Sequence, residues 1–100
     1  MSLETISARE MDKYLEESNI KIIDIRDHYE YIRGHIPNSI NIPYQDYDEI
    51  YEVINKDEVC ILYCARGNLS LFLGRDLSSE GFHIKSLYGG LNQYRGVLVR

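Results

Sequence analysis

The sequence predicts an α/β fold with a largely parallel sheet. Short β-branched or apolar segments alternate along the chain with segments whose apolar residues recur at helical spacing. The most apolar of the strand-like segments, 58–63, has the composition of a strand covered on both faces, which favours a central place in a parallel sheet. Because such sheets bind ligands beyond the carboxyl ends of their strands, residues that follow predicted strands are the first functional candidates.

The first half of the chain contains two predicted helices and two predicted strands. Ser7 and Glu10 have the spacing of a capping box, so a helix is expected from Ser7 to about residue 17. β-Branched residues and flanking prolines predict the strands, and Gly34 ends the short helix between them. These three elements are a strand at 20–25, a short helix at 27–33 and a strand at 39–42.

The second half continues the alternation. Tyrosine and isoleucine at helical spacing predict a helix over 45–55, which precedes the apolar strand 58–63. Leu73 and Leu77 share one face of a helix expected over 70–80. A strand at 83–88 and a short helix at 91–94 complete the elements that the pattern predicts.

Length and composition indicate one globular domain over residues 1–100. Hydrophobic residues make up 44% and charged residues 27% of the chain, which is ordinary for a folded domain. The net charge of −5 argues against general binding of nucleic acids or anionic membranes. The amino-terminal residues lack a signal-peptide pattern, and the longest apolar run is too short to span a membrane.

The two cysteines, Cys60 and Cys64, are not expected to form a disulfide. Four residues along a strand span roughly 13 Å, whereas a disulfide needs Cα atoms about 4.4–6.8 Å apart. Two free thiols indicate a reducing, cytoplasmic location. No cluster of histidine, cysteine and carboxylate side chains has ligand spacing, so no metal and no cofactor is expected.

Cys64 is the strongest candidate for a catalytic residue. It follows the apolar strand, precedes the polar loop residues 65–68, and is succeeded by a helical pattern. A sulfur at this position faces loop N–H groups and the positive end of a helix, both of which favour thiolate over thiol. The alternative is an inert buried thiol. The end of the strand is expected to expose the sulfur to the loop, which favours a nucleophile.

Three segments resemble the rhodanese domain family and together span nearly the whole chain. Residues 24–43, DIRDHYEYIRGHIPNSINIP, are similar to the family signature D-x-R…E-[FY]-x-x-G-H-I-P…N-I-P. Residues 63–70, YCARGNLS, resemble the family's active-site loop. Gly81-Phe82, followed by Tyr88-Gly89-Gly90-Leu91, resembles its closing segment.

This resemblance implies a three-layer α/β/α sandwich with a five-stranded, mostly parallel central sheet. It also implies a sulfurtransferase in which Cys64 carries sulfane sulfur as a persulfide. The implied donors are thiosulfate, a low-molecular-weight persulfide or a protein persulfide, and the implied acceptors are a thiol or cyanide. No nucleic acid or membrane partner is implied.

The loop departs from the family pattern in two places. Many active members carry arginine directly after the cysteine and again at the end of the loop, where this chain has Ala65 and Leu69. Fewer positive charges disfavour a doubly charged donor such as thiosulfate, so weak turnover of thiosulfate and a preference for persulfide donors are expected. Arg66 stands where a small residue is common.

The expected substrate-binding residues are those of the loop and the start of its helix, and each has a plainer structural alternative. Arg66 is suited to binding an anion with paired hydrogen bonds, and Gly67 to a positive φ. Ser70 is expected to cap the helix, or else to donate to the persulfide. Asp24 and Arg26 are expected to support the site, with Arg26 pairing with Glu30. The expected substrate-binding set is Ala65, Arg66, Gly67, Asn68, Leu69 and Ser70.

Two other functions fit the same fold. One is a binding or regulatory module with little turnover, which the missing loop arginines favour and Cys64 opposes. The other is a phosphatase or arsenate reductase, whose loop has the spacing C-x5-R. In this chain the position of that arginine is occupied by Ser70, so the spacing disfavours this function.

Overall fold

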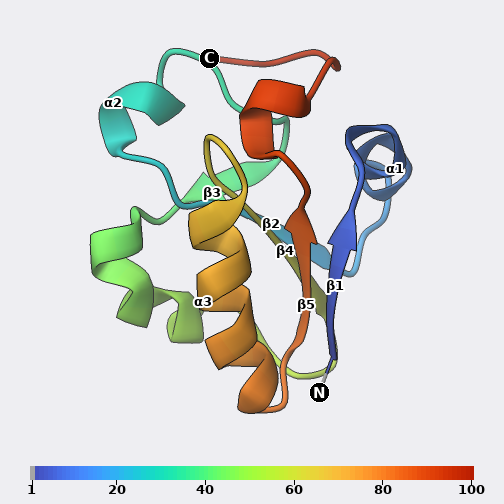
Figure 1. The fold of residues 1–100 in the computed structure, drawn as a ribbon, viewed down its shortest axis with the longest axis vertical. Coiled ribbons are helices and arrows are strands. Elements are labelled where there is room, and N and C mark those ends of the chain that lie inside the picture. Colours follow the sequence, from blue (N-terminus) through green and yellow to red (C-terminus); the bar gives the residue numbers. More distant parts are fainter. Residues whose placement is uncertain (1) are drawn as a thin grey trace.

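The computed structural model describes residues 2–100 and builds them around one sheet of five parallel strands (Figure 1). The strands lie in the order β1-β5-β4-β2-β3, so β4 occupies the centre, as its apolar composition predicted. The register pairs Asp24 at the end of β2 with Tyr63 at the end of β4. The strands are β1 (Ser2–Ile6), β2 (Ile20–Asp24), β3 (Ser39–Asn41), β4 (Val59–Tyr63) and β5 (His83–Leu87).

Helices cover both faces of the sheet, which gives the three layers that the sequence predicted. Helix α3 lies in front of the sheet in Figure 1, and α1 lies at its right-hand edge. The helical elements are α1 (Ala8–Tyr14), α2 (His28–Tyr31), the 3-10 helix η1 (Tyr44–Glu52), α3 (Asn68–Ser79) and the 3-10 helix η2 (Gly90–Gln93).

Alternation along the strands divides the core into two clusters. Ile23, Leu62 and Ile84 pack with α3 and η1 on one face. Their neighbours in the strands, such as Ile61 and Leu87, pack with α1 on the other. Because successive strand residues point to opposite faces, Cys64 shares the α3 face with Leu62, and it belongs to that cluster.

Several features of the fold differ from the sequence prediction, among them the end of α1 at Tyr14 and the 3-10 form of the short helix expected over 91–94. The pattern of residues gave no strand before the first helix, yet β1 pairs with β5 at one edge of the sheet. The segment expected as an α-helix over 45–55 is the 3-10 helix η1, which is interrupted at Asp46. Helix α3 begins at Asn68, two residues before the expected start. The capping box of Ser7 and Glu10 is confirmed.

Tyr63 fastens the centre of the sheet to the segment between α2 and β3. Its side chain is fully buried, and its phenol oxygen accepts the N–H of Ile36 at 3.0 Å and lies 3.3 Å from the hydroxyl oxygen of Ser39. Burial, and after it the charge of Asp24, raises the pKa of Tyr63, so the phenol stays neutral. The carboxyl end of β4, which leads into Cys64, is held in place by these bonds.

We predict that Tyr63→Phe destabilises the protein by about 1–3 kcal/mol, because the buried N–H of Ile36 loses its acceptor. Tyr51→Phe is the matched control, since its hydroxyl bonds Glu80 on the surface. That change is expected to cost about 0.5 kcal/mol or less. Urea unfolding of the two variants measures both effects, and equal losses would contradict the role given to Tyr63.

Candidate active site

The sulfur of Cys64 lies in a cradle of backbone N–H groups at the carboxyl end of β4. Its Sγ accepts the N–H of Gly67 at 3.1 Å and the N–H of Ser70 at 3.4 Å. Two such donors stabilise negative charge on sulfur. The sulfur thus faces the loop, as expected, although Cys64 is only 3% exposed to solvent. The loop folds over the sulfur because it turns directly into α3.

Gly67 makes this turn possible. Its φ of +96° lies in the left-handed region, as the sequence predicted, and it is the residue that caps α3. A Cβ at this position would lie 2.9 Å from the backbone nitrogen of Gly89, so a side chain has neither the conformation nor the room. Ser70 is therefore not the cap of the helix. It lies in the first turn, where its N–H is free to point at the sulfur.

The segment after β5 holds the loop from the other side. The N–H of Leu91 donates to the carbonyl of Cys64 at 2.9 Å, and the N–H of Asn92 donates to the carbonyl of Ala65 at 3.0 Å. Gly90 fits between them only because it has no side chain, since a Cβ would lie 2.4 Å from the Cys64 carbonyl oxygen. The loop is therefore held by its own N–H bonds to the sulfur and by the bonds from the segment after β5 to its carbonyl groups.

A pocket of about 210 Å³ adjoins the cradle. Its walls include Gly67, which donates to the sulfur, and Ser86, which comes from β5. Arg66 is the charged residue of the lining, and it is exposed. The remaining polar side chains come from Thr5, Asn68 and Tyr88. The lining is mostly apolar in area and carries one cation, which suits a small ligand with a single negative charge.

The two positions that lack arginine contribute no charge to the cradle. Leu69 is 43% exposed, and Ala65 is half-buried under the segment after β5. Asn68 begins α3, and its side-chain oxygen lies 3.1 Å from the nitrogen of Leu69. The loop therefore offers backbone N–H groups and one guanidinium to a ligand.

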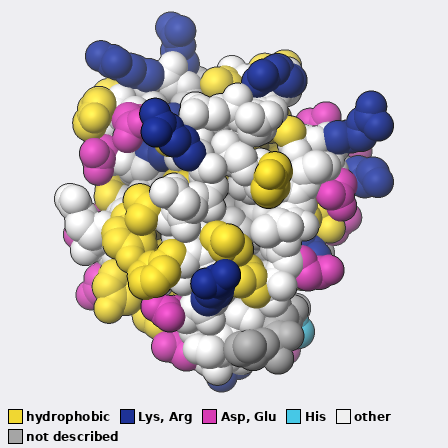
Figure 2. Space-filling view, viewed as in Figure 1, with side chains coloured by type: hydrophobic (Ala, Val, Ile, Leu, Met, Phe, Trp, Pro, Cys, Tyr) yellow, Lys and Arg dark blue, Asp and Glu magenta, His cyan; other side chains and the backbone are white. Residues whose placement is uncertain are grey.

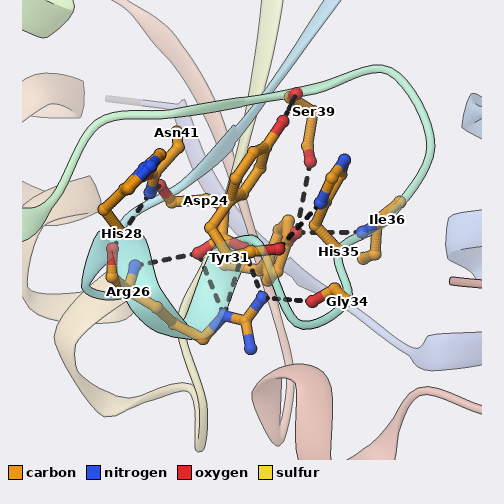
Figure 3. Close-up of polar contacts among 10 residues, drawn as sticks. Asp24, Arg26, His28, Tyr31, Gly34, His35, Ile36, Ser39 and Asn41 are labelled. Carbon is orange, nitrogen blue, oxygen red and sulfur yellow. Dashed lines mark hydrogen bonds and ion pairs between the residues drawn. The ribbon is translucent and has the colours of Figure 1, made fainter. Parts of the chain in front are cut away.

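Asp24 and Arg26 form a buried ion pair, and Asp24 is in register with Tyr63, on the face of the sheet opposite to Cys64. The Arg26 guanidinium donates to both oxygens of Asp24, at 2.7–3.1 Å, and also to the carbonyl of Gly34 at 2.7 Å (Figure 3). Among the described residues the partner of Arg26 is Asp24, so the expected pairing with Glu30 is wrong. Burial opposes the charge on Arg26, but the bonds to Asp24 outweigh it and raise the pKa.

This ion pair anchors the backbone around it. Asp24 is completely buried, and it also accepts the backbone N–H of Arg26 at 2.8 Å. Asn41 adds two bonds from its side chain to the carbonyls of Asp24 and Arg26, each at 3.0 Å. The bonds to Gly34 and from Asn41 join the end of β2 to neighbouring segments, so the pair belongs to the scaffold.

Exposed arginines lie near the carboxyl ends of several strands although the chain is acidic overall. Figure 2 shows several Lys and Arg side chains around the upper part of the molecule, where the strands end in Figure 1. Arg33, Arg66 and Arg95 are exposed residues of the segments that follow the strands. Acidic residues such as Asp27 and Glu30 stand in the same segments, so the charge around this end of the sheet is mixed.

Cys60 has a different environment from Cys64 although both thiols are free and buried. Burial, and after it the charge of Glu58, raises the pKa of the Cys60 thiol to about 12. Cys60 packs among apolar side chains, which agrees with its interpretation as a core residue. Among the residues that the structure describes, no group of three potential metal ligands occurs, and no helix is long and apolar enough to cross a membrane.

The five-stranded parallel sheet, with a cysteine loop at the end of its central strand, defines the class of α/β protein to which this chain belongs. The profile of the rhodanese-like domain matches residues 7–96, and the chain belongs to this family. A rhodanese-related protein from Thermoplasma volcanium is 29% identical with a TM-score of 0.82, and the match covers 96% of this chain and 97% of that one. The family resemblance and the fold class are therefore confirmed.

Two curated relatives connect the chain to the sulfurtransferases in general. A tRNA sulfurtransferase from Desulfurococcus amylolyticus is 39% identical over 79 residues, which are 79% of this chain and 16% of that protein. YtwF of Bacillus subtilis, which carries a provisional sulfurtransferase name, is 27% identical over 97 residues, 96% of this chain and 94% of that protein. The chain thus spans a small part of the first relative and nearly all of the second.

Sequence reasoning missed the contribution of β1 and β5 to the site. Ser86 and Thr5 line the pocket, and neither stands in a motif. The alternation of side chains along β5 could have indicated the position of Ser86. Ile84 packs toward α3, and Ser86 two residues later must point to the same face as Cys64.

We predict that iodoacetamide at pH 8 modifies the native protein at Cys64 much faster than at Cys60, because a thiol with a pKa near 12 stays protonated at that pH. Peptide mapping by mass spectrometry measures both sites. Unfolding in urea is the control, since it should make both cysteines react. Equal rates at the two sites in the native protein would contradict the contrast between their environments.

Proposed function

We propose that the protein is a sulfurtransferase that carries sulfane sulfur as a persulfide on Cys64. The observation that carries the proposal is the pair of N–H donors on the Cys64 sulfur, from Gly67 and Ser70. Donors in this position favour a thiolate before the reaction and hold negative charge on the persulfide after it. Membership of the rhodanese-like family and the sulfurtransferase name of a relative support the same chemistry.

The reaction has two sulfur-transfer steps. In the first, the Cys64 thiolate attacks the outer sulfur of a donor persulfide, the donor S–S bond breaks, and the donor leaves as a thiolate. In the second, an acceptor thiolate attacks the outer sulfur on Cys64, which returns to the thiolate. The outer sulfur is transferred each time, and no external oxidant or reductant is needed.

We further propose that the donor is a low-molecular-weight or protein persulfide, with thiosulfate a poor substitute. Thiosulfate brings two negative charges, and the loop has Ala65 and Leu69 where family members often have arginine. Arg66 supplies the single cation of the adjoining pocket. Two free thiols suit the reducing cytoplasm as the place of action.

A binding or regulatory module is the second candidate, and one observation favours it. Cys64 is 3% exposed, so a donor reaches the sulfur only if the loop residues shift. A phosphatase or arsenate reductase is disfavoured, because α3 begins at Asn68 and leaves Ser70 where the C-x5-R loop requires arginine.

We predict that wild-type protein gains one sulfur atom when it is treated with glutathione persulfide, and gains less with thiosulfate. Cys64→Ser is expected to gain none, while Cys60→Ser, the matched control, still takes up sulfur. Intact-protein mass spectrometry measures each mass. Uptake by folded Cys64→Ser would refute a persulfide on Cys64, and absence of uptake by folded wild type from either donor would favour the binding module.

We predict that Arg66→Gln raises the KM for glutathione as acceptor by about fivefold, which corresponds to about 1 kcal/mol for an exposed ionic contact. The value of kcat is expected to change less than twofold, because Arg66 does not contact the sulfur. Arg75→Gln is the control, since Arg75 is an exposed residue of α3 that does not line the pocket. Steady-state kinetics with equal effects in both variants would contradict a role for Arg66.

A further inference from the structure

A buried pair of hydroxyl groups lies next to the Cys64 sulfur. Ser70 is fully buried and Ser86 is 1% exposed, and their hydroxyl oxygens are 2.7 Å apart. The Ser70 hydroxyl oxygen is also 3.6 Å from the Cys64 sulfur and 3.2 Å from the carbonyl oxygen of Gly67. A short chain of polar atoms therefore runs from β5 through α3 to the sulfur.

The number of available protons limits the directions that the hydrogen bonds among Ser86, Ser70 and Cys64 can take. A serine hydroxyl donates one hydrogen bond and accepts two. When Cys64 is a neutral thiol, its S–H donates to Ser70, and Ser70 donates to the carbonyl of Gly67. Ser86 then has to be the donor in its bond with Ser70, because the one proton of Ser70 is already used.

Loss of the Cys64 proton changes the preferred acceptor of the Ser70 hydroxyl group. A thiolate or persulfide only accepts, so the Ser70 proton gains more by turning from the Gly67 carbonyl to the sulfur. This turn leaves no unpaired group, since the Gly67 carbonyl keeps the N–H of Leu71 at 3.2 Å. Ser86 donates to Ser70 in both states, and a donor at that position strengthens the bond that Ser70 gives to the sulfur.

We propose that Ser86 is a positioning residue that acts on Cys64 through Ser70. By donating to Ser70, it keeps the single Ser70 proton available for the anionic sulfur and holds the hydroxyl in place. The inference rests on the proposed function only in taking an anionic Cys64 as the working state. It adds a group from β5, outside the loop, to those that set the reactivity of the sulfur.

The pocket beside the cradle permits a conservative test. Ser86 is buried but is among the residues that line that pocket, and urea unfolding of Ser86→Thr checks that the additional methyl group is accommodated. Threonine is also well suited to a strand. Ser86→Thr therefore keeps the donor, while Ser86→Ala removes it with the smallest change in volume.

The experiment measures the rate of Cys64 alkylation by iodoacetamide at pH 7 in Ser86→Ala, Ser86→Thr, Ser70→Ala and the Ser70→Ala/Ser86→Ala double variant. Ser86→Ala is expected to slow the reaction by about fivefold, as loss of a bond in a charged network does, and Ser86→Thr to restore at least half of the rate. In the Ser70→Ala background, the Ser86 change is expected to have less than a twofold effect. Ser79→Ala, at the far end of α3, is the control.

Additive effects of the two alanine changes would overturn the proposal, because Ser86 would then act without Ser70. Slowing in both Ser86→Ala and Ser86→Thr, in proportion to their losses in urea unfolding, would also overturn it as a general effect of destabilisation. Alkylation needs no sulfur donor, so the result stands apart from the proposed function. If the proposed function fails, the protein takes up no sulfur, while the alkylation rates of the single and double variants still show the expected pattern.

Discussion

The hydrogen bonds from Gly67 and Ser70 to the Cys64 sulfur are the constraint on which the rest of the site depends. Both donors come from the point where the loop turns into α3, so the sulfur and the start of the helix are placed together. The turn needs the left-handed conformation of Gly67, and it needs the segment after β5 close behind it. A sulfur held in this way can carry charge without a metal, because oriented backbone dipoles take the place of a cation.

Residues away from the sulfur hold the ends of the central strands in place. Tyr63 fixes the end of β4 immediately before Cys64, and the Asp24–Arg26 pair fixes the end of the neighbouring strand β2. The charged residues also differ between the scaffold and the pocket. The buried charges of Asp24 and Arg26 are paired in the scaffold, whereas Arg66 is exposed at the pocket.

The sequence predicted the order of most elements because their patterns are local. Ser7 and Glu10 define a helix start by themselves, and the apolar run of β4 identifies a central strand. Strand β1 escaped because an edge strand has one neighbour and leaves Glu4 and Thr5 exposed, so its pattern is weak. Ser70 was misplaced as a cap because serine is a common cap, whereas Gly67 begins the helix through its backbone alone. The contact of Ser86 with Ser70 depends on how α3 packs against β5, and a single sequence indicates the face of Ser86 but not that contact.

The central claim is that the backbone cradle holds the sulfur that Cys64 carries. The most direct measurement is a crystal structure of the protein after treatment with glutathione persulfide. The account predicts a second sulfur atom bonded to the Cys64 sulfur and within hydrogen-bonding distance of N–H groups of residues 65–70. A persulfide that points away from these N–H groups into solvent, or a second sulfur found on Cys60, would contradict it.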